Sequence, residues 1–350
     1  MKKRFSVVAK TALVLVYLVI VAGALVRMTG SGMGCPDWPK CFGYYIPPTE
    51  LKELTWAPDK AFKQGQVIIK NDVLLVAKTD FKTDKYFEYT NWQKYIKHDY
   101  AVFNVYHTWI EYINRLLGAL GGLACLLMAI LSIWMFKVQK KITLFSWIVV
   151  FMMGFQAWLG KTVVDSNLSV YKITTHMMVA LLIVALILYV IKYASDNPKI
   201  SNKQIQVTTF NRLLWVAMLL TVIQIVMGTQ VRQYVDSEIK NGVTQSILWL
   251  QNPTIIFYIH RSFSIAVFAL NGFLIFYNKK MNLNFNKIKW VQTLIVLEIA
   301  TGIAMYYFDF PLGSQPAHLI IASLLFGVQF YLILESKKSQ NNFNDIQNIL

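Results

Sequence analysis

The stretch from Gly160 to His176 reads GKTVVDSNLSVYKITTH, and the stretch from Gly302 to His318 reads GIAMYYFDFPLGSQPAH. In both, the histidine follows the glycine by sixteen positions. Each glycine lies in an apolar segment, a short polar turn follows, and each histidine opens the next apolar segment. The shared spacing indicates that the chain repeats one helix-turn-helix unit.

Two other pairs of short motifs recur in the same order. They are Gly23 with Arg27 and Gly228 with Arg232, four residues apart in each pair, and Ile113-Asn114-Arg115 with Ile259-His260-Arg261 at the starts of two helices. We therefore expect two pseudo-symmetric four-helix bundles, residues 1–200 and 201–350. The first half carries an outer-loop insertion, about residues 29–106, whose mixed charge, aromatic residues and prolines predict a small folded cap.

Apolar residues make up 56% of the 350 residues, and the mean hydropathy is +0.44. These apolar residues gather in long blocks. A membrane-spanning helix needs about 20 mostly apolar residues, and the blocks approach that length. The blocks lie at about 9–28, 116–136, 143–163, 174–192, 210–230, 261–277, 289–308 and 317–335. The sequence therefore predicts an all-α, polytopic membrane protein with eight transmembrane helices.

The net charge is +16. The positive residues gather in loops on one side of the predicted membrane, so this charge does not indicate binding to nucleic acid. Every second loop is rich in lysine, so the positive-inside rule places both termini in the cytoplasm. The opening Lys-Lys-Arg and apolar run also fit a cleavable signal peptide, but the repeat requires this first helix to be retained. The lack of an Arg- and Ser-rich presequence favours a bacterial inner membrane over an organelle.

Three histidines, His176, His260 and His318, fall at the outer ends of apolar helices. Any one of them alone fits an interfacial residue with a hydrogen-bond partner. His260 and His318, however, begin two helices of the same half, and facing helices of a bundle bring such residues together across its core. Paired imidazoles hold a low-spin heme iron, while zinc would need a third ligand that this half does not offer.

The equivalent pair in the first half is Asn114 and His176. Asparagine is a poor ligand for heme iron, so His176 alone would hold an iron here and leave one face open. His107 is an imperfect substitute, since it lies about 10 Å from Asn114 along the helix. Glu111 shares a helix face with Asn114 and Arg115, which fits either a simple Glu111–Arg115 pair or a carboxylate that serves a membrane-embedded pocket.

Four arginines lie at outer helix ends, against the positive-inside rule. They are Arg27, Arg115, Arg232 and Arg261. Guanidinium groups bind carboxylates, so these residues suit heme propionates, one pair in each half; the alternative is snorkelling to lipid headgroups. Cys35 and Cys41, in the first outer loop, could form a static disulfide, cycle between thiol and disulfide, or hold a substrate in transit.

The ordered set of motifs resembles the heme A synthase family. The resemblance covers nearly all eight helices and rests on Gly23-Ala-Leu-Val-Arg27, Thr29-Gly-Ser-Gly32, the Cys35/Cys41 loop with Trp38-Pro39, Glu111-Tyr-Ile-Asn-Arg115, the Gln156 to Gly160 segment with His176, His260-Arg261, His318-Leu-Ile-Ile-Ala322 and Leu325-Phe-Gly327. In the family's motif, a histidine stands where this chain has Asn114.

The resemblance implies a heme b cofactor on His260 and His318, and a substrate heme near Glu111 and His176. The reaction would oxidise the C8 methyl group of heme O to the formyl group of heme A, with Glu111 as the catalytic carboxylate. A heme O synthase and cytochrome oxidase assembly factors are the implied partners, besides membrane lipid. Two other classes fit the spans: a cytochrome b-type electron carrier without a substrate heme, and a transporter built from repeats.

Overall fold

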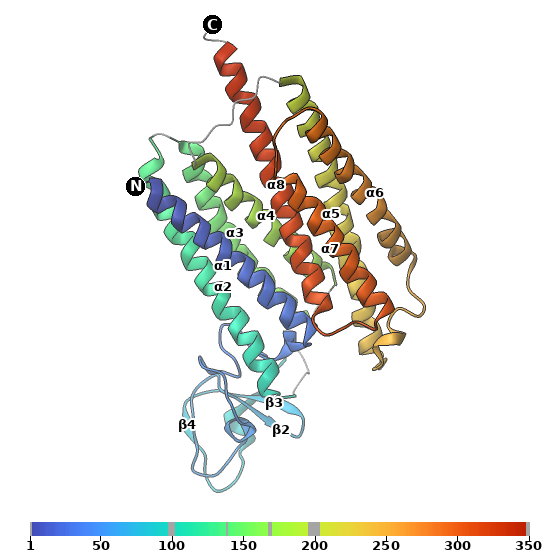
Figure 1. The fold of residues 1–350 in the computed structure, drawn as a ribbon. Helices are drawn as coiled ribbons and strands as arrows, with labels where there is room; N and C mark the ends of the chain where they lie inside the picture. Colours follow the sequence, from blue (N-terminus) through green and yellow to red (C-terminus); the bar gives the residue numbers. More distant parts are fainter. Residues whose placement is uncertain (1, 97–101, 138, 167–169, 195–203, 348–350) are drawn as a thin grey trace. The chain divides into compact units, whose positions relative to one another are not determined.

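The computed structural model describes residues 2–96, 102–137, 139–166, 170–194 and 204–347. Eight long helices form within these residues, and each holds a window apolar enough to cross a membrane (Figure 1). They are α1 (Lys2–Met28), α2 (Val105–Ser132), α3 (Lys140–Asp165), α4 (Val170–Ala194), α5 (Gln204–Lys240), α6 (Ile255–Lys280), α7 (Ile288–Tyr307) and α8 (Ser314–Gln347). The all-α polytopic fold with eight spans is confirmed. The pseudo-symmetry of two bundles stays a prediction, and its boundary at residue 200 lies outside the described residues.

Most of the helices extend beyond the apolar blocks. At the start of α2, Asn104 Oδ1 accepts hydrogen bonds from the backbone N–H groups of Tyr106 and His107, at 2.9 and 3.2 Å, and so caps the helix ahead of the apolar run. Asn114 therefore lies in the third turn of α2. The histidines of α4, α6 and α8 lie in the second turns of their helices, so the expectation that they open these helices is wrong: the polar and aromatic residues before them are helical too.

Close contacts divide the chain into two compact units. The first contains residues 1–17, 122–153 and 177–350. Within it, α5 contacts α6 and α8, and α7 contacts the same two helices, which closes a four-helix ring (Figure 1). Phe210 of α5 stacks on Phe285, with ring centroids 5.1 Å apart, and Asn211 Nδ2 donates a hydrogen bond to the Ile333 carbonyl at 3.1 Å. These contacts join α5 to its neighbours at one end of the ring.

The second unit contains residues 18–121 and 154–176, and thus the inserted cap. The cap holds a three-stranded antiparallel sheet in the order β2 (Val67–Lys70), β3 (Val73–Ala77), β5 (Trp92–Lys94), and β1 (Ala61–Phe62) pairs with β4 (Phe81–Lys82). Asn71 and Asp72, with φ of 50° and 57°, form the two-residue turn between β2 and β3. The predicted small cap is thus folded, and its fold is β.

Alternate residues of the sheet face two apolar clusters, as the pleat requires. Val67 and Leu74 pack in the cluster that holds Cys35 and Cys41. Their neighbours along the strands pack on the other side around Trp92. The sheet therefore links the disulfide loop to the rest of the cap.

Candidate functional site

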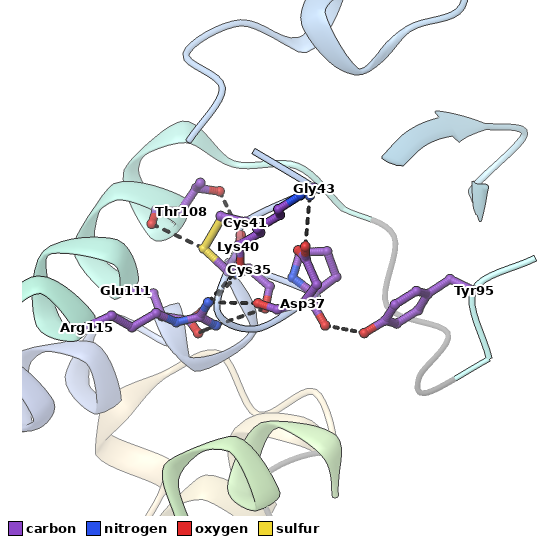
Figure 2. The surroundings of a disulfide bond; sticks show 11 residues. Cys35, Asp37, Lys40, Cys41, Gly43, Tyr95, Thr108, Glu111 and Arg115 are labelled. Carbon is purple, nitrogen blue, oxygen red and sulfur yellow. Dashed lines mark hydrogen bonds and ion pairs between the residues drawn. A yellow bond between two sulfur atoms is a disulfide. The ribbon is translucent and has the colours of Figure 1, made fainter. Parts of the chain in front are cut away.

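The first turns of α2 carry Thr108, Glu111 and Arg115, whose spacing of three and four residues places them on one helix face. Thr108 Oγ1 donates a hydrogen bond to the Gly34 carbonyl at 2.8 Å, and the Cys35 backbone N–H donates one to Glu111 Oε2 at 2.9 Å (Figure 2). Arg115 Nη2 forms an ion pair with the other oxygen of Glu111. The Glu111 side chain is only 5% exposed, so its orientation is fixed by these partners.

Arg115 also binds the loop between the two cysteines. Its Nη1 donates hydrogen bonds to the carbonyl oxygens of Asp37 and Lys40, at 2.7 and 3.0 Å (Figure 2). Most of the guanidinium's donors are thus engaged within the protein, by Glu111 and by the loop. A propionate contact for Arg115 stays a prediction, and these bonds give Arg115 a positioning role in addition.

Cys35 and Cys41 form a disulfide, which is one of the alternatives that the sequence offered for this pair. Both cysteines are fully buried, at 0% and 1% exposure. Because thiol–disulfide exchange requires a thiolate to reach a sulfur atom, this burial favours a structural bond over a redox-active one. A redox-active pair stays a prediction.

Asp37 and Tyr95, which lie outside the spans, complete the loop's anchors. Asp37 Oδ2 accepts a hydrogen bond from the Gly43 N–H at 2.8 Å. Burial raises the pKa of the Asp37 carboxyl above its usual range, although the Gly43 bond and the nearby Arg115 act in the opposite direction. The Tyr95 hydroxyl donates to the Pro36 carbonyl, and burial raises the pKa of this phenol, so it remains a donor at neutral pH.

His176 and Asn114 both present unpaired polar atoms within the second unit. His176 Nδ1 and Asn114 Oδ1 are buried and have no hydrogen-bond partner, so neither bonds to the other. The His176 carbonyl accepts a hydrogen bond from Gln156 Nε2 at 2.9 Å, which fixes α4 against α3. A Cβ at Gly160 would lie 3.4 Å from His176 Cε1, so this glycine gives the imidazole its space. Buried unpaired atoms of this kind fit a site that a ligand completes.

His260 and His318 approach each other in the first unit, as predicted. Their ring centroids are 6.4 Å apart and their planes are inclined by 73°. Gln224 Nε2 donates to the His260 carbonyl at 2.8 Å, and a Cβ at Gly228 would lie 3.2 Å from His260 Cε1. The arrangement of glutamine, glycine and histidine around His260 thus repeats the one around His176.

The residues of the second pair fit heme iron. An atom held about 2 Å from a nitrogen of each imidazole requires ring centroids roughly 6 Å apart, close to the observed separation. His260 Nδ1 is buried without a partner. Among the described residues, no three His, Cys, Asp or Glu side chains gather as a metal site.

The remaining predicted arginines have protein partners. Arg232 Nη2 forms an ion pair with Asp236 at 2.8 Å, one helical turn on, and Nη1 donates to Gln315. Arg261 lies over the rings of three aromatic side chains, Phe257, Tyr258 and Tyr306, at 5.7 to 5.9 Å. Arg27 lies in the last turn of α1. Propionate binding by these residues stays a prediction.

Sequence reasoning gave no role to four polar residues beside the histidines. They are Gln156, Gln224, Glu298 and Thr301. Gln156, Gln224 and Glu298 each precede a glycine by four positions, at Gly160, Gly228 and Gly302. That shared spacing was the signal that could have found them. His107, the substitute ligand considered for the first half, lies in the first turn of α2 with its backbone next to Gly34.

The fold and the sites define a polytopic membrane protein with histidines on the second turns of its helices and a disulfide-closed outer loop. The sequence matches the COX15-CtaA family, described as cytochrome oxidase assembly protein, over residues 6–330, and the chain belongs to this family. The family resemblance drawn from the motifs is therefore confirmed.

Curated relatives of similar length carry one name. The chain is similar to the heme A synthase of Ehrlichia canis (24% identity, 91% of this chain and 89% of the relative) and to that of Flavobacterium johnsoniae (25% identity, 91% and 94%). It is also similar to the heme A synthase of Rickettsia prowazekii (23% identity, 93% and 96%).

Proposed function

We propose that this protein is a heme A synthase, a membrane oxidoreductase that oxidises the C8 methyl group of heme O to the formyl group of heme A. The observation that carries the proposal is the approach of His260 and His318 at heme-compatible distance, in a chain whose full-length relatives bear this name. Membership of the cytochrome oxidase assembly family agrees with it.

The cofactor of the proposal is heme b in the C-terminal half, held by His260 and His318, with Arg232 and Arg261 near its propionates. Heme b held by two histidines supplies electron transfer. Gly228 and Gly302 leave space for the two imidazoles, and Gln224 fixes the backbone of His260. The protein's part at this site is to orient both rings.

The substrate heme O would bind in the N-terminal half beside Glu111, His176 and Asn114, with Arg27 at a propionate. His176 is the one imidazole of the predicted pair, since Asn114 replaces the second, so one face of the substrate stays accessible. Glu111 accepts a proton or stabilises positive charge as the methyl group is oxidised. Its carboxylate is held for this task by Arg115 and the Cys35 N–H.

The proposal also includes location and partners. The eight spans lie in a bacterial inner membrane with both termini in the cytoplasm, as the lysine-rich loops predict. A heme O synthase would supply the substrate, and cytochrome oxidase assembly would use the product.

Pigment analysis of the purified full-length protein, produced together with a heme O synthase, tests the proposal. We expect heme A or hydroxylated heme O together with heme b. Heme b alone would support an electron carrier, and a protein free of heme would support the transporter. His260→Ala and His318→Ala should each abolish the low-spin heme spectrum, and an unchanged spectrum in either variant would refute the ligand assignment.

A further inference from the structure

Three positions of the helical repeat carry long polar side chains next to a histidine, and one of them differs in chemistry. Gln156 and Gln224 each donate a hydrogen bond from Nε2 to the carbonyl of the adjacent histidine, at 2.9 and 2.8 Å. The third position is Glu298, in the middle of α7. An ionised carboxylate has no hydrogen to donate, so it cannot make the bond that the two glutamines make.

Glu298 contacts the imidazole ring of its histidine instead of the backbone. Its Oε2 lies 3.0 Å from His318 Nδ1, and Thr301 Oγ1 lies 2.8 Å from the same nitrogen. Thr301 Oγ1 also lies 3.0 Å from the carbonyl oxygens of Leu297 and Glu298, either of which can accept its one hydrogen. An ionised Glu298 can only accept at Nδ1, and a Thr301 hydroxyl that donates to its own helix accepts there too. In that arrangement Nδ1 carries the hydrogen and Nε2 keeps its lone pair for a metal.

His318 differs from the two other histidines in the side chains that lie at its Nδ1. The Nδ1 atoms of His176 and His260 are buried without a partner. We propose that Glu298 and Thr301 are positioning residues that fix the tautomer of His318 and make it the more strongly donating of the two ligands of the C-terminal heme. The inference rests on the proposed heme site and deepens it by assigning unequal roles to the two histidines.

The position of Glu298 argues against a purely structural role. An ionisable side chain within a transmembrane helix is costly, and its presence indicates a function with a named partner. Glutamine serves the packing role at both equivalent positions, so packing alone does not require a carboxylate. The Glu298 side chain is 16% exposed, its Oε2 contacts His318, and its Oε1 has no hydrogen-bond partner.

The physical consequence concerns the redox state of the heme. A carboxylate that accepts the Nδ1 hydrogen raises the basicity of a metal-bound histidine. A more basic ligand stabilises ferric iron relative to ferrous iron and so lowers the midpoint potential. Substitutions at such supporting positions typically change metal affinity about 10- to 100-fold. We expect Glu298→Gln to weaken the binding of ferric heme by about 10-fold relative to ferrous heme.

Redox titration of the purified full-length protein loaded with heme b, followed at the low-spin absorption band, tests the inference. We expect Glu298→Gln to keep the low-spin spectrum and to shift the midpoint potential to a more positive value. Thr301→Val should shift it in the same direction by less. Thr293→Val is the matched control, because Thr293 is an exposed residue of α7 whose hydroxyl bonds only to the Lys289 carbonyl; its potential should equal that of the parent.

The outcomes separate the two proposals. A parent protein that binds no low-spin heme contradicts the proposed function itself. If the parent binds low-spin heme and Glu298→Gln has the same midpoint potential as the parent, the inference is overturned and the proposed function is not. If Glu298→Gln fails to assemble heme, Thr301→Val decides, since an unshifted potential in that variant also overturns it.

Discussion

At the scale of single residues, Glu111 has two fixed partners, the Arg115 guanidinium and the Cys35 N–H. Glu111→Gln keeps the side-chain shape and removes the negative charge. We expect heme A formation to fall by about 100- to 10,000-fold, the usual contribution of a general acid or base, with heme b content unchanged. Extraction and chromatography of the hemes measure both. Glu88→Gln, an exposed change in the cap, is the control, and full heme A formation in Glu111→Gln would exclude the role.

The glycines beside the histidines give a graded prediction. A Cβ at Gly228 would lie 3.2 Å from His260 Cε1, whereas a Cβ at Gly302 would lie 3.8 Å from His318 Cε1, and one at Gly272 meets nothing within 4 Å. Gly228→Ala should therefore displace the imidazole and reduce low-spin heme, while Gly302→Ala retains it. Gly272→Ala is the control and should stabilise α6 by about 1 kcal/mol. Equal heme occupancy in the alanine variants of Gly228 and Gly272, read from the absorption spectrum, would contradict this ordering.

At the scale of elements, the loop between Cys35 and Cys41 is held by bonds that do not depend on the disulfide. Arg115 binds two of its carbonyl groups, and Thr108 binds the Gly34 carbonyl. Replacing both cysteines by serine should cost about 2 kcal/mol from loop entropy. Heme A formation should therefore fall less than in Glu111→Gln, and limited proteolysis should cut the cap faster. Activity lost as fully as in Glu111→Gln would instead indicate a redox role.

Element positions were largely predictable from the sequence, and element ends were not. Long apolar blocks locate spans because hydrocarbon requires them, but helix α2 begins where Asn104 caps it, and α5 runs on to Lys240 with an Arg232–Asp236 pair in its added turns. The strands of the cap were missed, although Asn71-Asp72 between two apolar runs is typical of a two-residue hairpin.

The candidate site was predictable where the repeat carried it. His260 and His318 were paired because both were expected at the starts of helices in the same half, and the structure brings them together. The contacts of Arg115 with the loop carbonyls depend on the path of the chain between the cysteines, which no periodicity encodes. Glu298 was overlooked as one charge within an apolar span, although its spacing from Gly302 marked it.

At the scale of the whole molecule, the orientation in the membrane rests on the lysine-rich loops. We predict that Tyr86 in the cap lies outside and that Asn282, between α6 and α7, lies in the cytoplasm. Both are exposed, and the native cysteines give little background, since Cys125 is buried and the other two form the disulfide.

A membrane-impermeant thiol reagent applied to spheroplasts reads this orientation. Tyr86→Cys should be labelled in intact spheroplasts, because the cap faces the medium. Asn282→Cys should be labelled only after the membrane is permeabilised, because the positive-inside rule retains Lys279, Lys280 and Lys287 in the cytoplasm. The cysteine-containing parent is the control for background labelling. The reverse pattern would place the Glu111 region on the cytoplasmic side and contradict the proposed topology, since the disulfide loop that holds Glu111 needs an oxidising compartment.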